Sequence, residues 1–468
     1  MTAQRRTAAR RVAAVLGGCA AAAAALGAAA AHADTLTAGR AVTPPGVVAC
    51  SHSLATSPAG GRTALLYEAG TGCGGEPTRL FARLGRGRNL GPALELENRV
   101  VPPHNVRVTT FGAQAAVAPD GGAVAAWVSR GREAGRDHLR VAIAPPGRRF
   151  GRPQTLSRVR FQAGHVPQIA VAGIVAGSRG RAVVTWSLRP RDSGVGSLRA
   201  AVRPPRGGFG RSQRLGAYSL VFDSHPSLAM APSGAVLAAW RPGEEPSASA
   251  AVLRPRARRF GATRRISGGD SAGQVRATSG PGGAAASWSD DRRQAGTPIR
   301  IRVARLRRDG RIAAARTVAS VDTAGGSLEV DGPFVAVALS GPVATWQVFR
   351  DISEAGDGRI DSTRIEATAP GSPNFASLAL GGALTSTPAI GALQHRTILA
   401  WHEQIAPGRS RLRVAARPAG GGWRTPRTLA ETDGAVTISA SRDSALLLWQ
   451  PLHPLGVRGP LQMAVYRP

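Results

Sequence analysis

The chain has 468 residues, and 60 basic against 28 acidic residues give it a formal net charge of +32 at pH 7. All 60 basic residues are arginine, and a surface this positive attracts nucleic acid, anionic wall polymers and acidic lipid head groups, less strongly as salt rises. Beyond the N-terminal segment no run reaches the roughly 18 apolar residues of a membrane helix, which excludes a helical membrane protein.

The first 33 residues have the organisation of a secretory signal segment. Arg5, Arg6, Arg10 and Arg11 precede an Ala/Val/Leu run that ends at Ala31-His32-Ala33. This order of a basic, an apolar and a small-residue region predicts cleavage after Ala33 and a secreted, extracellular domain over residues 34–468. The alternative is a cell-surface lipoprotein anchored through Cys19, although the apolar run continues beyond that cysteine.

Two cysteines, Cys50 and Cys73, remain after this cleavage. An even number of cysteines in an exported chain predicts one disulfide, here between Cys50 and Cys73. The alternative is a pair of free, buried thiols.

Eight short apolar runs, each ending in a large aromatic residue, recur along residues 34–468. The aromatic residues are 48 to 60 positions apart. They are Tyr67, Trp127, Trp186, Trp240, Trp288, Trp346, Trp401 and Trp449. This spacing is too long for coiled-coil or helical-hairpin repeats and is near the size of a four-stranded propeller blade.

The third repeat illustrates the strands expected of each unit. Its apolar runs cover 167–172, 182–186, 198–204 and 210–216, and we name such runs A, B, C and D. Apolar positions alternate within the runs and Gly, Pro, Asp and Ser separate them, which predicts β-strands, and no stretch sustains a helical period. Turns at 119–122 (Pro-Asp-Gly-Gly) and 232–234 (Pro-Ser-Gly) are typical of tight A–B connections.

The two ends of the chain complement each other. Only one run, at 461–468, follows Trp449, so the eighth repeat lacks strand D. The run at 36–43 resembles a D strand, and pairing it with the last blade removes two exposed sheet edges. The predicted fold is an all-β, closed propeller of four-stranded blades with eight blades. Seven blades and an irregular extra sheet are the alternative, because the sixth repeat fits the pattern poorly.

The Pro-Asp-Gly turn, the small apolar strand before it, Gly164-His165 in the loop ahead and the aromatic-ended strand resemble WD40-type and sialidase-type propellers. The resemblance covers nearly all of residues 34–468 and implies architecture alone. Neither the Trp-Asp dipeptide of the first family nor the Ser-x-Asp-x-Gly-x-Thr-Trp box of the second occurs. The resemblance therefore implies no activity, and no cofactor or metal is predicted.

Propeller strand order distributes charge between two faces. With A at the channel and D at the rim, A–B and C–D connections share one face, and B–C and D–A connections share the other. The C–D connections carry 22 arginines against one acid, Asp309. They cover 85–91, 145–152, 203–214, 254–265, 305–312 and 417–427. The first face is expected to be strongly basic, and the second, with Asp137, Asp290 and Glu403 among its B–C acids, mixed in sign.

The arginines expected to engage an anionic partner lie on the C–D connections. They are Arg148, Arg149, Arg206, Arg258, Arg259, Arg307 and Arg308. The planar guanidinium fork pairs bidentately with phosphate and carboxylate groups, which suits it to this role.

Imidazoles and carboxylates of the D–A connections are expected to surround the channel mouth on the mixed face. They are His52, His104, His165, His225, Asp270, Asp322 and Asp433. Such a ring suits a sugar, a carboxylate or a divalent cation. The simpler interpretation is that these residues cap turns and bond neighbouring loops.

Sequence matches to catalytic and metal-binding motifs lack the neighbouring residues or elements that those motifs require. A Gly-x-Ser-x-Gly match at 269–273 lacks the following helix, and a partial calcium loop at 357–361 lacks acidic first and twelfth ligands. Neighbouring carboxylates at 244–245 and 290–291 seldom converge as glycosidase pairs. The eight aromatic residues are expected to be wedges between blades rather than a stacking platform.

The leading hypothesis is a secreted, non-catalytic, monomeric binding propeller that engages an anionic polymer or surface through its arginine-rich face. Binding to nucleic acid would be non-specific. One alternative is an extracellular polysaccharide hydrolase or lyase with its site at the channel mouth, where His165 or His225 beside Asp223 would supply the titratable pair. Another is a protein-interaction scaffold.

Overall fold

The computed structural model describes most of the domain predicted from the sequence. The described residues are 34–44, 47–70, 78–100, 112–130, 136–160, 169–188, 195–219, 226–243, 247–268, 272–290, 297–321, 327–351, 360–367, 388–406, 409–432, 435–451 and 458–468. The predicted signal segment lies outside them. In this part of the chain no helix has the length and apolarity to span a membrane.

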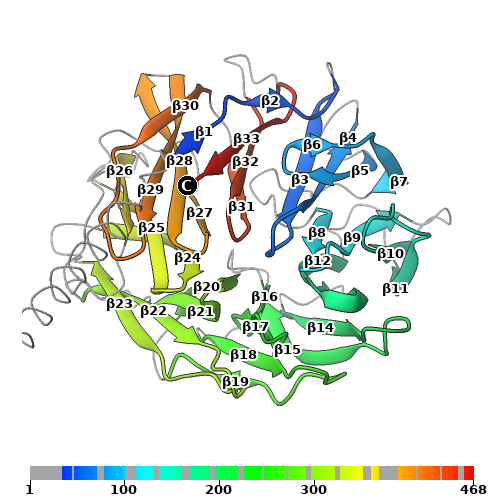
Figure 1. The fold of residues 1–468 in the computed structure, drawn as a ribbon. Helices are drawn as coiled ribbons and strands as arrows, with labels where there is room; N and C mark the ends of the chain where they lie inside the picture. Colours follow the sequence, from blue (N-terminus) through cyan, green and yellow to red (C-terminus); the bar gives the residue numbers. More distant parts are fainter. Residues whose placement is uncertain are drawn as a thin grey trace, which may run out of the picture.

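Antiparallel strands follow one another around a ring (Figure 1). The first repeat contains β3 (Ala49–Thr56), β4 (Arg62–Ala69), β5 (Thr78–Arg86), β6 (Asn89–Leu90) and β7 (Leu94–Val100). The second contains β8 (Gln114–Val117), β9 (Ala123–Arg130), β10 (Arg136–Ala144) and β11 (Gln154–Arg160). The third contains β12 (Ile169–Gly177), the 3-10 turn η1 (Ser178–Gly180), β13 (Arg181–Leu188), β14 (Val195–Arg203) and β15 (Gln213–Ser219).

The later repeats continue the same order. The fourth contains β16 (Ser227–Met230), β17 (Val236–Trp240), β18 (Ser249–Leu253) and β19 (Arg264–Arg265). The fifth contains β20 (Ala272–Gly280), β21 (Gly283–Asp290), β22 (Ile299–Arg305) and β23 (Arg316–Val321). The sixth contains β24 (Ser327–Ala338), β25 (Gly341–Asp351) and β26 (Ile360–Ala367), and the seventh contains β27 (Ala389–Ala392), β28 (Arg396–Ala406), β29 (Arg409–Pro418) and β30 (Arg427–Glu431).

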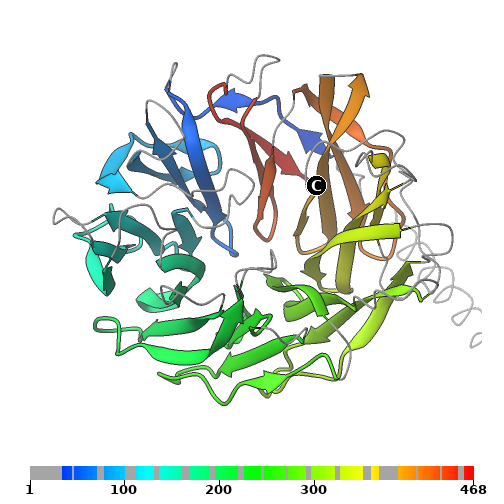
Figure 2. The ribbon, with the colours of Figure 1, turned by 180° about the vertical axis from the view of Figure 1, so that it is seen from behind.

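The last repeat joins the two ends of the chain. It contains β31 (Val436–Ala440), β32 (Ala445–Trp449) and β33 (Gln462–Arg467), and the N-terminal strands β1 (Thr35–Leu36) and β2 (Arg40–Ala41) pair with β33. The predicted N-terminal contribution to the last blade is therefore confirmed. Seen from either side, the first (blue) and last (red) repeats lie beside each other (Figures 1 and 2). Thr56 and Ser439 bond across this junction, with 3.0 Å between their hydroxyl oxygens.

The all-β propeller prediction is confirmed, but the predicted count of eight blades is not. The described strands form seven hydrogen-bonded sheets, which matches the seven-bladed alternative. Eight aromatic-ended repeats occupy these seven sheets because the first two repeats share one sheet, through β7–β9 pairing at Val100 and Ser129. The innermost strands contact one another in the order β3, β8, β12, β16, β20, β24, β27 and β31, and β31 contacts β3. The irregular sixth repeat has three described strands, and residues 368–387 after it lie outside the described part.

Large aromatic side chains fill the spaces between neighbouring repeats. None of the eight strand-ending aromatics is more than 2% exposed. Trp127 belongs to a core cluster with Leu66 and Leu80 of the preceding repeat, and Tyr67 clusters with Met463 of the last repeat. Each ring of this size buries roughly 150 to 250 Å², so these residues contribute strongly to the apolar contact at each junction. The predicted wedge role of these residues is confirmed.

The meander order gives the ring two different faces. We call the face with the A–B turns and C–D hairpins the hairpin face, and the face with the B–C and D–A connections the mouth face. Arg62 links both elements of the hairpin face, because its Nη1 donates to the carbonyl oxygens of Gly121 (2.8 Å) in an A–B turn and Pro145 (2.7 Å) in a C–D hairpin.

Candidate functional site

The C–D hairpins of the hairpin face share a short sequence and a shape. Arg-Arg-Phe-Gly occurs at 148–151 and 258–261, and Gly-Gly-Phe-Gly occurs at 207–210. In each hairpin the last glycine N–H donates to a strand C carbonyl. The bonds are Gly151 to Ile143 (2.9 Å), Gly210 to Val202 (3.0 Å) and Gly261 to Val252 (2.9 Å). The repeated bond gives these hairpins a common, defined path.

The phenylalanine of each Arg-Arg-Phe-Gly hairpin anchors it to the preceding repeat. Phe150 and Phe260 are 8% and 5% exposed and belong to clusters that include Leu80 and Leu198, respectively. The side-chain amide of Gln213 in β15 also brackets Phe260, accepting from its N–H (2.9 Å) and donating to its carbonyl oxygen (3.0 Å). The backbone that carries the two arginines before each phenylalanine is therefore held in a defined position.

All seven arginines predicted to bind an anionic partner are exposed on these hairpins. Arg307 and Arg308 occupy the fifth hairpin, where the Arg307 N–H donates to Arg311 O (2.8 Å). Asp309, the single acid of the six hairpins, accepts from the Arg311 N–H (2.9 Å), so its carboxylate is bonded to its own turn. The arrangement presents positive charge on adjacent repeats of one face.

Another set of arginines on the hairpin face holds neighbouring repeats together, a role missed at the sequence level. Arg181 begins β13 and donates to the carbonyl oxygens of Gly234 (2.6 Å) and Arg254 (3.0 Å) in the next repeat, as Arg62 does between the first and second repeats. Burial lowers the pKa of both guanidinium groups. The sequence signal is an arginine five residues before the aromatic, at Arg62, Arg181 and Arg396.

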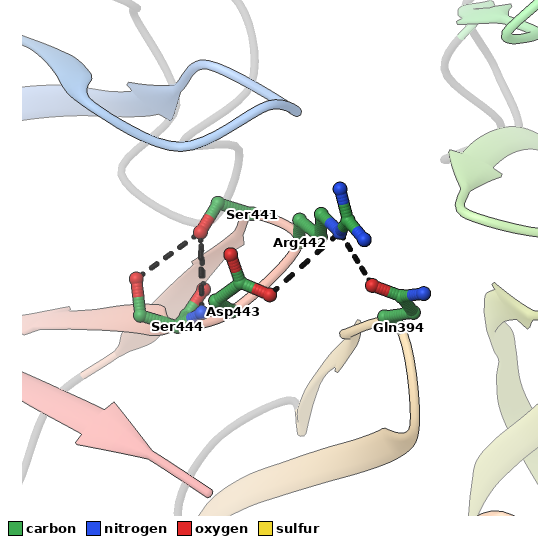
Figure 3. Close-up of polar contacts among 5 residues, drawn as sticks. All are labelled: Gln394, Ser441, Arg442, Asp443 and Ser444. Atoms are coloured by element: carbon green, nitrogen blue, oxygen red, sulfur yellow. Dashed lines mark hydrogen bonds and ion pairs between the residues drawn. The ribbon is translucent and has the colours of Figure 1, made fainter.

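The A–B turns near the ring axis are also bonded across repeat boundaries (Figure 3). In the last repeat, the Arg442 side chain donates to the Gln394 amide oxygen of the seventh repeat, and Arg442 N–H donates to Pro58 O of the first (2.9 Å). Ser441 Oγ accepts from the Ser444 N–H at 3.2 Å and closes the turn locally. Because Arg442 and Asp443 are 63% and 77% exposed, their charges face solvent.

Of the predicted channel-mouth residues, the structure describes His52. It lies within β3, opposite Tyr67, rather than in a D–A loop as predicted, because strand A begins at Ala49. Burial and, secondarily, the Arg458 charge lower the pKa of His52 to about 4, so its imidazole is neutral at neutral pH. The other six predicted mouth residues are outside the described part: His104, His165, His225, Asp270, Asp322 and Asp433.

Acidic groups near the mouth face are buried in strands, contrary to the predicted loop positions. Asp290 ends β21, accepts from Trp288 Nε1 (3.0 Å) and pairs with Arg302 (3.7 Å). Glu403, in β28, pairs with Arg411 at 2.6 Å. Asp137 is 1% exposed within β10. β21 and β28 extend further than the apolar runs because Asp290 and Glu403 have partners on the neighbouring strand.

Glu68 is the most enclosed acid of this group. It follows Tyr67 in β4, is 0% exposed, and accepts from the N–H of Ala113 (3.0 Å) and from Thr78 Oγ1 (3.4 Å). Burial is the main influence and raises the pKa of its carboxyl. Within the described ranges, no three His, Cys, Asp or Glu side chains gather in a way that would hold a metal ion.

Cys50 lies in β3, close to the mouth face, and is disulfide-bonded. The predicted partner, Cys73, lies outside the described residues, so the Cys50–Cys73 pairing remains a prediction.

Comparison with known proteins assigns no family: no family model and no curated protein matches the chain. Solved structures with a similar fold include the Penicillium chrysogenum α-L-arabinanase complexed with arabinobiose, at 9% identity and TM-score 0.41, covering 92% of this chain and 98% of that one. A polysaccharide lyase has 8% identity and TM-score 0.46 over 88% and 90% of the two chains.

A Fusarium graminearum α-L-arabinofuranosidase has 12% identity and TM-score 0.37 over 64% of this chain and 93% of that one. Such identities and scores carry no argument about activity. The substrates in these names belong to those proteins.

Proposed function

We propose that this protein is a secreted binding propeller that engages an anionic polymer through its hairpin face. The observation that carries the proposal is the exposed arginine pair on each anchored Arg-Arg-Phe-Gly hairpin, at Arg148-Arg149 and Arg258-Arg259. Two buried phenylalanines and their glycine bonds hold these hairpins in place, so a ligand need not order them on binding.

Electrostatics supports the same face. Its six hairpins carry 22 arginines and one acid, and that acid is bonded to its own turn. Guanidinium groups pair bidentately with phosphate or carboxylate oxygens, and many such contacts along a polymer release counterions. The proposed mode is therefore a multipoint, salt-sensitive contact with a polyanion.

A mutational test follows from the position of the arginines. The variant replaces Arg258, Arg259, Arg307 and Arg308 by Gln, and a matched control replaces Arg40, Arg158, Arg160 and Arg316, exposed arginines of the outer strands. We expect the hairpin variant to bind a sulfated or phosphate-bearing polymer more weakly and with a flatter salt dependence, by roughly 0.7 to 0.9 in log–log slope per lost contact. Equal losses in both variants would contradict a role for this face in particular.

The second candidate is an extracellular polysaccharide hydrolase or lyase with its site at the channel mouth, an activity class named for some of the propellers of similar fold. The observation that favours it is the burial of ionisable groups, Glu68, Asp290 and His402, each placed one or two residues after the aromatic of a different repeat. Acid–base catalysis needs titratable groups in a shielded setting. Its test is product release from acidic and neutral polysaccharides, compared between the wild type and His225→Ala.

A further inference from the structure

An open pocket of about 480 Å³ lies on the hairpin face between the first two repeats. Two A–B turns and two C–D hairpins form it. Its charged lining residues are Arg62, Arg86, Asp120, Arg148 and Arg149. The volume is within the range of about 300 to 1,000 Å³ that is common for small-molecule sites.

Positive charge dominates the lining. Arg86, Arg148 and Arg149 are exposed there, and Arg62 ties the walls together through the carbonyl oxygens of the second repeat. The one acid, Asp120, accepts hydrogen bonds from the N–H groups of Gly122 (3.0 Å) and Arg179. These two bonds occupy the carboxylate and partly offset its charge, so the pocket as a whole favours an anion.

The walls are open and carry no flat apolar surface. Gly60, Gly61 and Gly147 have φ values of +83°, +94° and +71°, and a Cβ at any of them would meet nothing within 4 Å. Left-handed backbone favours glycine at these points, and the missing side chains leave room beside the arginines. No aromatic side chain is among the lining residues, so a sugar or base ring would find no stacking platform.

We propose that this pocket binds a phosphate group carried by an anionic polymer. A tetrahedral phosphoryl group offers oxygens in several directions to guanidinium groups that approach from different walls, whereas a planar carboxylate is satisfied by one fork. The inference rests on the proposed function and narrows it. The pocket holds one anionic unit specifically, and the remaining hairpins contribute general attraction.

The test uses the full domain and an oligomer of about ten glycerol phosphate units. The pocket variant replaces Arg86, Arg148 and Arg149 by Gln, and the matched control replaces Arg158, Arg160 and Arg316, exposed arginines of the outer strands, which removes the same charge away from the hairpins. Affinity is measured at about 0.5 M NaCl, where the Debye length falls to about 4 Å and long-range attraction is screened. We expect about a tenfold loss for the pocket variant and less than about twofold for the control.

The other possible results distinguish a failure of the pocket from a failure of the proposed function. A pocket variant that loses less than about twofold in affinity, like its control, would overturn the pocket and leave the proposed function standing, whereas no wild-type binding at any salt concentration would overturn both. An oligogalacturonate that binds as tightly and with the same pocket dependence would overturn the choice of phosphate. The double variant Arg148→Lys with Arg149→Lys keeps the positive charge but removes the two guanidinium forks. A partial loss of affinity in this variant supports the site even if the Gln variant fails to fold. Full retention of affinity contradicts recognition by the guanidinium forks.

Discussion

On the hairpin face, exposed arginines such as Arg148 and Arg258 stand on hairpins anchored by buried phenylalanines. Near the mouth face, Glu68, Asp290 and Glu403 are buried inside the strands and bonded there. A buried charge is tolerated only when paired and hydrogen-bonded, whereas an exposed guanidinium stays hydrated at little cost. The comparison indicates that these buried acids mainly stabilise the fold, whereas the exposed arginines are not needed for its stability.

The largest stability effect should come from the buried acids. Asp290→Ala removes the acceptor of Trp288 Nε1 and the partner of Arg302, and we expect a loss of about 3 kcal/mol in the free energy of unfolding. Denaturant unfolding measures it, with Asp309→Ala on the hairpin face as control, for which the change should stay within about 0.5 kcal/mol. Similar losses of unfolding free energy for the two variants would contradict the difference between the two faces.

The arginines that join neighbouring repeats refine this comparison of the two faces. They stabilise the fold although they belong to the hairpin face. Arg181→Ala leaves the carbonyl oxygens of Gly234 and Arg254 without their donor, and we expect a loss of about 2 kcal/mol. The exposed Arg211 is the matched control, and its replacement by alanine should change stability by less than about 0.5 kcal/mol. An Arg181→Ala protein as stable as the control variant would show that these bonds contribute nothing.

A pH-dependent effect should follow from His52. Its pKa is about 4 in the folded protein against 6.5 for the free side chain, so the unfolded chain binds more protons between these values. This contribution to stability is present above pH 6.5 and is lost as pH falls towards 4. Thermal unfolding across this window should show a weaker acid dependence for His52→Gln than for the wild type; identical profiles would contradict the assignment.

The smallest stability effect is expected for the arginine pairs themselves. Arg258→Gln with Arg259→Gln should change the unfolding free energy by less than about 0.5 kcal/mol, because both side chains are exposed while Phe260 keeps the hairpin anchored. Unfolding and polymer binding are measured on the same preparation. A clear loss of stability would mean that these arginines are structural, like Arg181.

Much of the fold could be predicted because the same strand pattern occurs eight times in the sequence. The runs at 182–186 and 198–204 correspond to β13 and β14, and the glycine turn at 119–122 has Gly121 at φ +82°. The pairing of β1 and β2 with β33 followed from the missing strand at the end of the chain. Periodicity and turn chemistry are local signals, and a repeat multiplies them.

The errors come from contacts that apolar patterns do not encode. The apolar pattern assigns Asp290 and Glu403 to loops because charged residues usually end strands, but cross-strand arginines extend β21 as far as Asp290 and β28 past Glu403. The pairing of Val100 with Ser129, which merges two repeats into one sheet, depends on a register between distant strands. Exposed arginines such as Arg148 and Arg258 could be located because glycine and proline mark their hairpins as surface turns, although Arg417 in the last hairpin is buried.

The most direct test of the central claim is a salt titration of the wild-type domain on three immobilised polymers: a phosphate-bearing wall polymer, duplex DNA and a neutral polysaccharide. The hairpin face predicts binding to both anionic polymers at low salt, retention of the phosphate-bearing polymer as salt rises, and no binding to the neutral one. Salt-independent binding to the neutral polysaccharide, with none to either polyanion, would contradict it and favour a site at the mouth face.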